Sequence, residues 1–204
     1  MKVTARIALA TFAIACLAST ALAGPRLGGA VGLGSANDNV DNGLVLQGYL
    51  ELDVREDLTL RGGLSYLTGD TTGETLRDGE LTMLGIEAAA LYRVKLDKAT
   101  SYLGAGIGYY TPEHAFSEDV ETQLALLNLE ADDDLDSGIG FFLTGGIRVP
   151  MSDTVSIGAS ARYLFLEVDD HATRGDLTVS ESISSTEEID LGTLFLSASL
   201  QIQF

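Results

Sequence analysis

Apolar and polar residues alternate along most of the chain, and the pattern is clearest at its end. Between residues 194 and 204 every even-numbered residue is apolar, whereas the odd-numbered residues after Phe195 are serines and glutamines. Successive side chains of a β-strand point to opposite faces, so strict alternation predicts a strand with one apolar face. The last eleven residues are therefore predicted to form one strand.

Seven earlier segments show the same alternation. With the last one, the predicted strands are 27–35, 44–55, 58–67, 81–96, 101–110, 140–149, 154–168 and 194–204. No segment holds a helical period instead, and after the N-terminal region no window approaches the roughly 18 consecutive apolar residues of a membrane-spanning helix. The pattern predicts an all-β fold of eight strands.

The predicted connections fall into two classes that alternate along the chain. Residues 56–57, 97–100 and 150–153 are short turns, and 37–43 is of intermediate length. Residues 68–80, 111–136 and 169–190 are long and polar. Short turns at one end and long loops at the other are typical of bacterial outer-membrane barrels, whereas a soluble sandwich has no reason to segregate its connections.

The composition of the two strand faces indicates which face meets lipid. The set opposite the apolar one is rich in Gly, Ser, Thr and Gln. An eight-stranded barrel has an interior just wide enough for side chains, which small and a few long polar residues can fill. In lipid the outer face must be apolar and the sheet closed. The predicted fold is an eight-stranded antiparallel up-and-down transmembrane β-barrel.

The charged residues of the strands lie on the polar set and are predicted to face the lumen. This charge network comprises Glu51, Arg61, Glu87, Arg93, Arg148 and Arg162. We expect Glu87 to pair with Arg162, and Glu51 to pair with some of Arg61, Arg93 and Arg148. Arg or Lys on the lipid face would cost about 2–4 kcal/mol at the bilayer midplane. The alternative is that these charges cover the solvated face of a soluble sandwich.

Aromatic residues of the apolar set are placed where girdles would lie. Tyr66, Tyr109, Tyr163 and Phe165 are near the long-loop ends, and Tyr92 and Phe204 are near the other rim. Amphipathic rings at these levels straddle headgroups and hydrocarbon.

The chain resembles a known family at its C-terminus and in its overall pattern. Phe204, with Ile202 and Leu200 at every second position before it, resembles the C-terminal signature that the barrel-assembly machinery recognises. The third residue from the end is usually aromatic and is Ile202 here. Residues 24–204 resemble the small OmpA-transmembrane and OmpX-like outer-membrane barrels. The resemblance implies this fold and an outer-membrane location, and it assigns no functional residue.

The N-terminus is predicted to be a secretory signal. Lys2 and Arg6 precede an apolar run, and the sequence Ala-Leu-Ala at 21–23 has the form of a signal-peptidase site. Residues 1–23 are the expected signal peptide and 24–204 the barrel domain. Lipidation at Cys16 is the alternative. Cleavage after Ala23 leaves no cysteine and takes the net charge from −18 to −20.

The strong negative charge excludes a nucleic-acid partner, because a phosphate backbone would be repelled. The only histidines, His114 and His171, lie in predicted loops without a His-x-Ser arrangement on a strand, so no catalytic residue is assigned.

Four clustered aspartates, Asp132, Asp133, Asp134 and Asp136, resemble hard-cation ligands. An EF-hand loop aligned on Asp132, however, has Ser137 at the sixth position in place of Gly and Leu143 at the twelfth in place of Glu. Asn37, Asn39 and Asp41 form a similarly loose array. We expect no cofactor and no metal site.

The sequence therefore predicts an integral outer-membrane protein with acidic external loops and a structural, adhesive or loop-mediated binding role. Expected partners are outer-membrane lipid and lipopolysaccharide and the barrel-assembly machinery, with divalent cations at the acidic loops as a further candidate. Two alternatives stay open at this point. One is a soluble periplasmic barrel that binds an apolar ligand, and the other is a barrel enzyme that modifies lipid A.

Overall fold

The computed structural model describes residues 24–36, 43–71, 79–116, 129–176 and 179–204. The predicted signal peptide, Cys16 and the asparagines of residues 37–42 lie outside the described residues, so the structure does not address those predictions.

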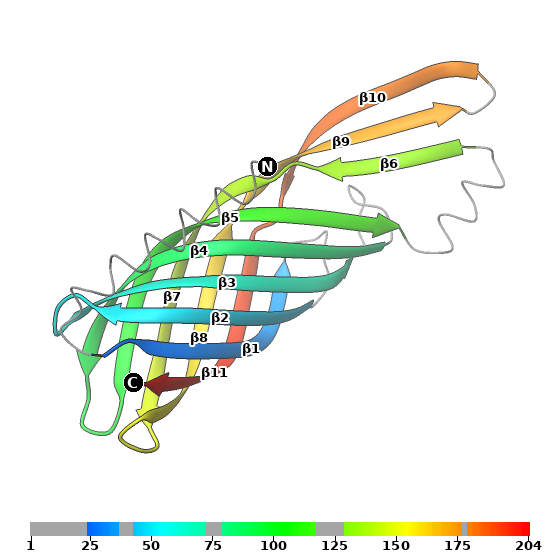
Figure 1. Ribbon diagram of the computed structural model, residues 1–204. Helices are drawn as coiled ribbons and strands as arrows, with labels where there is room; N and C mark the ends of the chain where they lie inside the picture. Colours follow the sequence, from blue (N-terminus) through cyan, green and yellow to red (C-terminus); the bar gives the residue numbers. More distant parts are fainter. Residues whose placement is uncertain (1–23, 37–42, 72–78, 117–128, 177–178) are drawn as a thin grey trace.

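Eight strands form a closed antiparallel barrel in the order β1-β11-β8-β7-β5-β4-β3-β2 (Figure 1). They are β1 (Arg26–Ala36), β2 (Gly43–Asp53), β3 (Leu58–Thr71), β4 (Gly79–Lys95), β5 (Thr100–Phe116), β7 (Gly138–Pro150), β8 (Val155–Phe165) and β11 (Thr193–Gln203). Each predicted strand corresponds to one of these, although the predicted strand 154–168 continues three residues past the end of β8. The last strand pairs with the first, with Gln203 opposite Arg26 and Thr193 opposite Ala36. The predicted eight-stranded barrel is confirmed.

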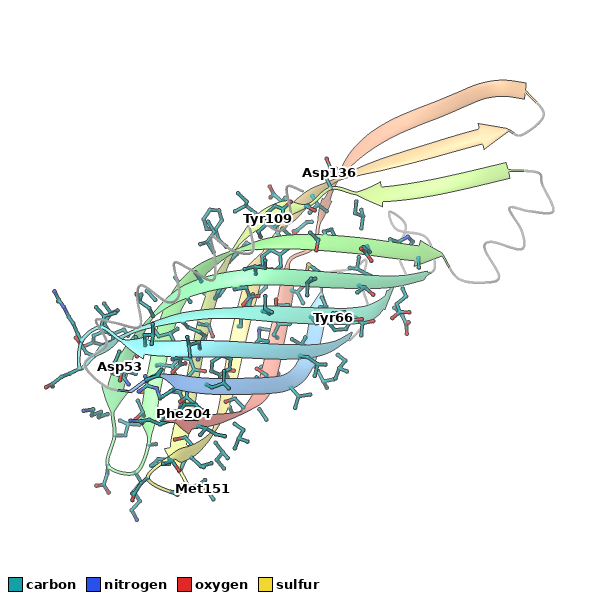
Figure 2. The ribbon with its side chains drawn as sticks, in the orientation of Figure 1. Asp53, Tyr66, Tyr109, Asp136, Met151 and Phe204 are labelled. Carbon is teal, nitrogen blue, oxygen red and sulfur yellow. The ribbon has the colours of Figure 1, made fainter. Side chains whose placement is uncertain are left out.

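The apolar set of every strand faces outward, as its alternation predicts. Leu103 and Leu143 are 69% and 55% exposed although both are large and apolar. Figure 2 shows side chains standing out from the barrel wall, among them the labelled Tyr66 and Tyr109. Such an exposed apolar surface, continuous around a closed sheet, is what hydrocarbon requires and water disfavours.

In the described part of the chain, no helix has the length and apolar character needed to cross a membrane.

The three short turns lie together at one end of the barrel, which we call the short-turn end. Backbone hydrogen bonds close them, from Val54 N to Leu58 O at 3.0 Å, from Leu96 N to Ala99 O at 2.8 Å, and from Met151 N to Val155 O at 2.8 Å. Each turn joins neighbouring strands, as expected of an up-and-down barrel. The segregation predicted from connection lengths is therefore present.

The prediction of long loops at the opposite end is wrong in two respects. Strands β3, β4 and β5 continue past their predicted ends, to Thr71, from Gly79 and to Phe116. Three further strands, β6 (Leu129–Leu135), β9 (Glu167–Asp176) and β10 (Val179–Asp190), form a separate antiparallel sheet in the order β10-β9-β6. Backbone pairing continues where side chains no longer need to be apolar, so the hydrophobic alternation ends before the strands do.

This outer sheet continues from the β8–β11 pair of the barrel and rises beyond its long-loop end (Figure 1). Only Leu166 separates β8 from β9, and its carbonyl oxygen accepts a hydrogen bond from Leu191 N at 2.8 Å. Leu166 and Leu191 are buried, at 1% and 2% exposure. The sheet is therefore attached to the barrel through a packed apolar junction.

Candidate functional site: a filled lumen and an outer sheet

The inward set of the strands fills the lumen in three layers, of which the first lies near the short-turn end. Glu51 on β2 is fully buried. Its carboxylate accepts hydrogen bonds from Arg61 Nη2 at 2.7 Å, Arg148 Nη2 at 3.0 Å and Gln201 Nε2 at 2.8 Å. Arg26 Nε approaches it at 3.4 Å. The structure thus brings Glu51 together with Arg61 and Arg148.

A second carboxylate, Asp53, lies beside this group. Arg26 holds it through both terminal nitrogens, Thr59 donates its hydroxyl to it at 2.8 Å, and Arg93 Nη2 approaches it at 2.9 Å. Arg93 therefore pairs with Asp53 rather than with Glu51. Asp53 and Arg26 are absent from the predicted network, although both occupy inward positions. Arg26 precedes the predicted strand 27–35 by one residue, and extending the alternation to it would have found it.

The second layer is centred on Glu87 and Arg162, which the structure brings together. Arg162 Nη1 and Nη2 contact the two carboxylate oxygens of Glu87, each at 2.7 Å. The Tyr110 hydroxyl accepts from Arg162 Nη2 at 2.7 Å and donates to Glu87 at 3.2 Å. The Arg162 guanidinium also lies 3.9 Å from the centroid of the Phe142 ring. A bidentate, aromatic-backed arginine of this kind is among the stronger polar contacts in proteins.

Glycines on the same strand or on a neighbouring strand make room for the large inward side chains. A Cβ built on Gly108 would lie 2.6 Å from the Tyr110 hydroxyl, and one built on Gly146 would lie 2.6 Å from that of Tyr102. The Arg61 guanidinium in turn lies 4.3 Å from the Tyr49 ring centroid. The many glycines of the inward set therefore leave the space that a few large inward side chains fill.

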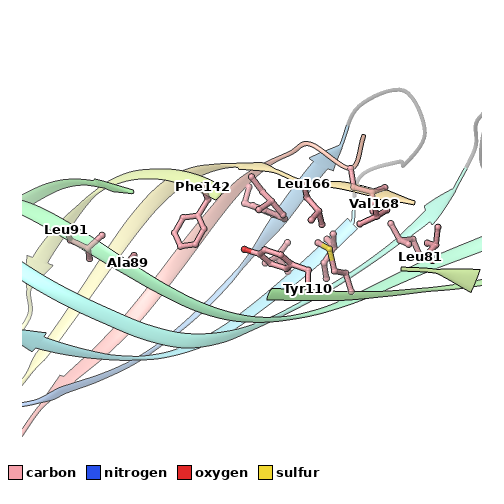
Figure 3. Close-up of a cluster of buried hydrophobic side chains, with 14 of the residues drawn as sticks. Leu81, Ala89, Leu91, Tyr110, Phe142, Leu166 and Val168 are labelled. Carbon is pink, nitrogen blue, oxygen red and sulfur yellow. The ribbon is translucent and has the colours of Figure 1, made fainter. Parts of the chain in front are cut away.

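The third layer, toward the long-loop end, is apolar. Figure 3 shows Leu81, Leu166 and Val168 there, beyond Tyr110 and Phe142 of the second layer. Leu81 and Leu166 are each 1% exposed, and Val168 is 4% exposed. The composition of the inward set predicts that small residues and a few long polar ones fill the lumen, and it does not anticipate this apolar layer. The inward residues change from Gly and Ser to Leu and Met as the strands leave the charged layers.

The space left between the two charged layers is small. A cavity of about 20 Å³ lies among Tyr49, Arg61, Glu87 and Arg162. A cavity of this volume holds about one water molecule. The described side chains thus leave room there for a water and not for a solute.

Comparison with known proteins places this architecture in a family. The sequence model described as "Outer membrane protein beta-barrel domain" matches residues 4–191. The chain belongs to this family. It is therefore an integral protein of the bacterial outer membrane, as the sequence predicts, and not a soluble periplasmic barrel. Short turns of such barrels face the periplasm and long connections face outward.

Solved structures share the fold of this outer-membrane barrel at low sequence identity. OprG from Pseudomonas aeruginosa is 12% identical with a TM-score of 0.64, over 89% of this chain and 97% of OprG. Neisserial surface protein A is 15% identical with a TM-score of 0.55, over 88% and 96% of the two chains. AlkL is 14% identical with a TM-score of 0.56, over 90% and 92%. No curated protein matches the sequence.

The predicted girdle and assembly residues of this barrel lie on its outer surface. Tyr66, Tyr92, Tyr109 and Phe165 are exposed, and the half-buried Tyr163 packs its ring edge-on to Phe165 with centroids 4.6 Å apart. Phe204, Ile202 and Leu200 are also exposed, at 72%, 40% and 51%. An assembly signal must be accessible in this way, although its recognition stays a prediction.

The histidines and three of the four clustered aspartates occupy strands rather than the predicted loops, and Asp136 lies between β6 and β7. His114 lies on β5 of the barrel, and His171 lies on β9 of the outer sheet. Asp132, Asp133 and Asp134 lie on β6, where Asp134 is opposite His171 in the β6–β9 pair. Within the described residues, no group of three or more His, Cys, Asp or Glu side chains is placed to hold a metal ion.

Proposed function

We propose that this protein is a closed outer-membrane anchor whose outer sheet binds a partner outside the cell. The filled lumen is the observation that carries the proposal. Two charged layers and an apolar layer occupy the described interior, so passage of a solute would require breaking several buried ion pairs. The surface that remains for interaction is the sheet beyond the barrel.

Two features of the outer sheet support a binding role. Of the described strands, β10 pairs only with β9, which leaves the other edge of β10 open to an added strand. Residues 129–136 and 167–190 together contain 13 acidic residues and one basic residue. A surface of that charge attracts basic partners and repels acidic ones. We therefore propose a partner with a basic, extended segment.

We further propose that the protein has no catalytic activity. An acyl-transfer site requires a nucleophile and a base within hydrogen-bond reach of one another. His114 and His171 belong to different sheets, one in the barrel and one outside it. We also propose that the apolar outer face contacts outer-membrane lipid and lipopolysaccharide. The barrel-assembly machinery is proposed to recognise Phe204.

A charge-matched pair of variants tests the binding role. In the first, Asp132, Asp133, Asp134 and Asp170 of the outer sheet are replaced by Asn. In the second, four acidic residues of the sequence stretch 70–80, Asp70, Glu74, Asp78 and Glu80, are replaced by Asn or Gln. Both lose four negative charges. Binding of a fluorescent lysine-rich peptide to proteoliposomes of zwitterionic lipid is measured by co-sedimentation.

We expect the first variant to lose peptide binding and the second to retain it, because only the first alters the sheet. Equal losses in both variants would show that binding reflects diffuse charge and would refute a role specific to the sheet. Planar-bilayer conductance of the wild-type protein provides the second test. Stable single-channel steps of nanosiemens size would refute the closed anchor.

A further inference from the structure

The charges at the short-turn end of the lumen do not balance. We call this group the lumen floor. It consists of four arginines, Arg26, Arg61, Arg93 and Arg148, and two carboxylates, Glu51 and Asp53. None of these side chains is more than 15% exposed. With every arginine charged, the lumen floor carries two positive charges in excess of its carboxylates.

The two carboxylates are already shared among the arginines. Glu51 contacts Arg26, Arg61 and Arg148, and Asp53 contacts Arg26 and Arg93. Part of the excess charge is stabilised by aromatic faces, since the guanidinium of Arg61 lies 5.3 Å and that of Arg148 5.5 Å from the Tyr102 ring centroid. Such contacts do not replace a counter-ion, because a buried charge without one is costly.

No other described side chain neutralises the lumen floor. The Glu87–Arg162 pair above it is neutral as a whole. The side chains of the rim below it comprise three cations and four anions, all exposed to solvent. These are Arg55, Lys95, Lys98, Glu56, Asp57, Asp97 and Asp153. Exposed rim charges of mixed sign are screened by water and salt and nearly cancel one another.

Arg93 marks where a counter-ion would bind. It is the arginine of the lumen floor beside the turn of residues 54–57, where its Nη2 contacts Asp53 and the carbonyl oxygen of Glu56 at 3.2 Å. Its Nε is buried and finds no acceptor in the described structure. We propose that the lumen floor binds a small inorganic anion, chloride or phosphate, which enters from the periplasm beside Arg93 and Arg26.

Thermal unfolding of the purified barrel in a neutral detergent tests the site. The midpoint is followed by circular dichroism at constant ionic strength while gluconate, a bulkier organic anion, is replaced by chloride or by phosphate. We expect the wild-type midpoint to rise by roughly 5–10 °C when the anion reaches about 100 times its dissociation constant. A response to both ions indicates a general anion site, and a response to phosphate alone indicates an oxyanion site.

Two variants that change the net charge of the lumen floor in opposite directions distinguish the two possible roles of Arg93, as an anion ligand or as a structural partner of Asp53 alone. Arg93→Gln removes one excess charge, so we expect it to lose the anion response and to be no less stable than wild type in gluconate. Asp53→Asn adds one excess charge, and we expect a lower midpoint in gluconate with a larger anion response. Arg55→Gln, in the exposed turn next to Arg93, is the control and should respond like wild type.

Three outcomes would overturn the proposal. The first is a wild-type midpoint that is the same in gluconate, chloride and phosphate. The second is an Arg93→Gln variant that keeps the full response to chloride or phosphate. The third is an Arg93→Gln variant that is destabilised equally in all three salts, since Arg93 would then serve only as the partner of Asp53.

Discussion

Loss of the Glu51 carboxylate should strongly weaken the barrel. Replacing Glu51 by Gln preserves the size of the side chain but removes the charge that three arginines share. The carboxylate is fully buried, and donors from β3, β7 and β11 reach it at 2.7, 3.0 and 2.8 Å. Removing one member of a buried ion pair typically costs about 3–5 kcal/mol, because the remaining charge stays buried without its partner. We expect a loss of that size in the free energy of unfolding.

The assay is urea unfolding of the protein in phospholipid vesicles. The chain has no tryptophan, so loss of structure is followed by circular dichroism or by tyrosine fluorescence. Glu56→Gln is the matched control, because Glu56 lies exposed in the turn three residues after β2 ends at Asp53, and its replacement should change the free energy of unfolding by less than about 0.5 kcal/mol. A Glu51→Gln variant within about 1 kcal/mol of wild type would show that the arginines do not depend on this carboxylate, and the reasoning would fail.

Four further predictions follow from the layers of the barrel. Glu87→Gln and Arg162→Gln should each lower the free energy of unfolding. The loss in the double variant should be smaller than the sum of the two single losses by about 0.5–3 kcal/mol, which a double-mutant cycle by urea unfolding measures. Gly108→Ala should cost about 1–3 kcal/mol by overpacking Tyr110, whereas Gly48→Ala, whose Cβ meets nothing within 4 Å, should cost nothing. Leu143→Arg on the lipid face should cost about 2–4 kcal/mol in the same assay, and Met151→Arg in the periplasmic turn should be close to neutral. Phe204→Ala should slow insertion into the outer membrane of growing cells, and Gln203→Ala should not.

Each of these pairs has a result that contradicts its premise. Additive losses at Glu87 and Arg162 would mean that the two residues are not coupled. Equal effects of Gly108→Ala and Gly48→Ala would remove the case for close packing around Tyr110. Tolerance of Arg at position 143 would place that position outside the hydrocarbon, and normal insertion of Phe204→Ala would exclude it as an assembly signal.

The sequence predicts the barrel because lipid imposes one rule on every spanning strand. Wherever residues such as Leu103 and Leu143 must face hydrocarbon, alternation reveals the strand and its orientation. The rule does not apply above the membrane, where β6, β9 and β10 pair through their backbones and their sequences need not alternate, so polarity alone misassigns them as loops. The same limit applies inside the barrel.

Pairing within the lumen depends on which strands lie across from one another. Alternation places Glu51, Glu87 and the arginines inside, and the height of each along its strand suffices to match Glu87 with Arg162. The partner of Arg93 depends on the local register of β2, β3 and β4, which places Asp53 beside it. Arg26 is missed because it occupies the first position of its strand, where a pattern of alternation has no earlier residue to support it.

The contact between Arg26 and Asp53 also has a consequence for how the barrel closes. Strand β1 joins the two ends of the barrel sheet and contains four glycines, so its own side chains specify its alignment with β2 and β11 only weakly. Sliding β1 by two residues would leave each of its side chains on the same face, at little hydrophobic cost. It would also move Arg26 by roughly 7 Å along the strand and away from Asp53. The contact of Arg26 with Asp53 therefore fixes the register of β1 where the barrel closes. Burial in lipid alone would allow several registers, and Arg26 favours one of them.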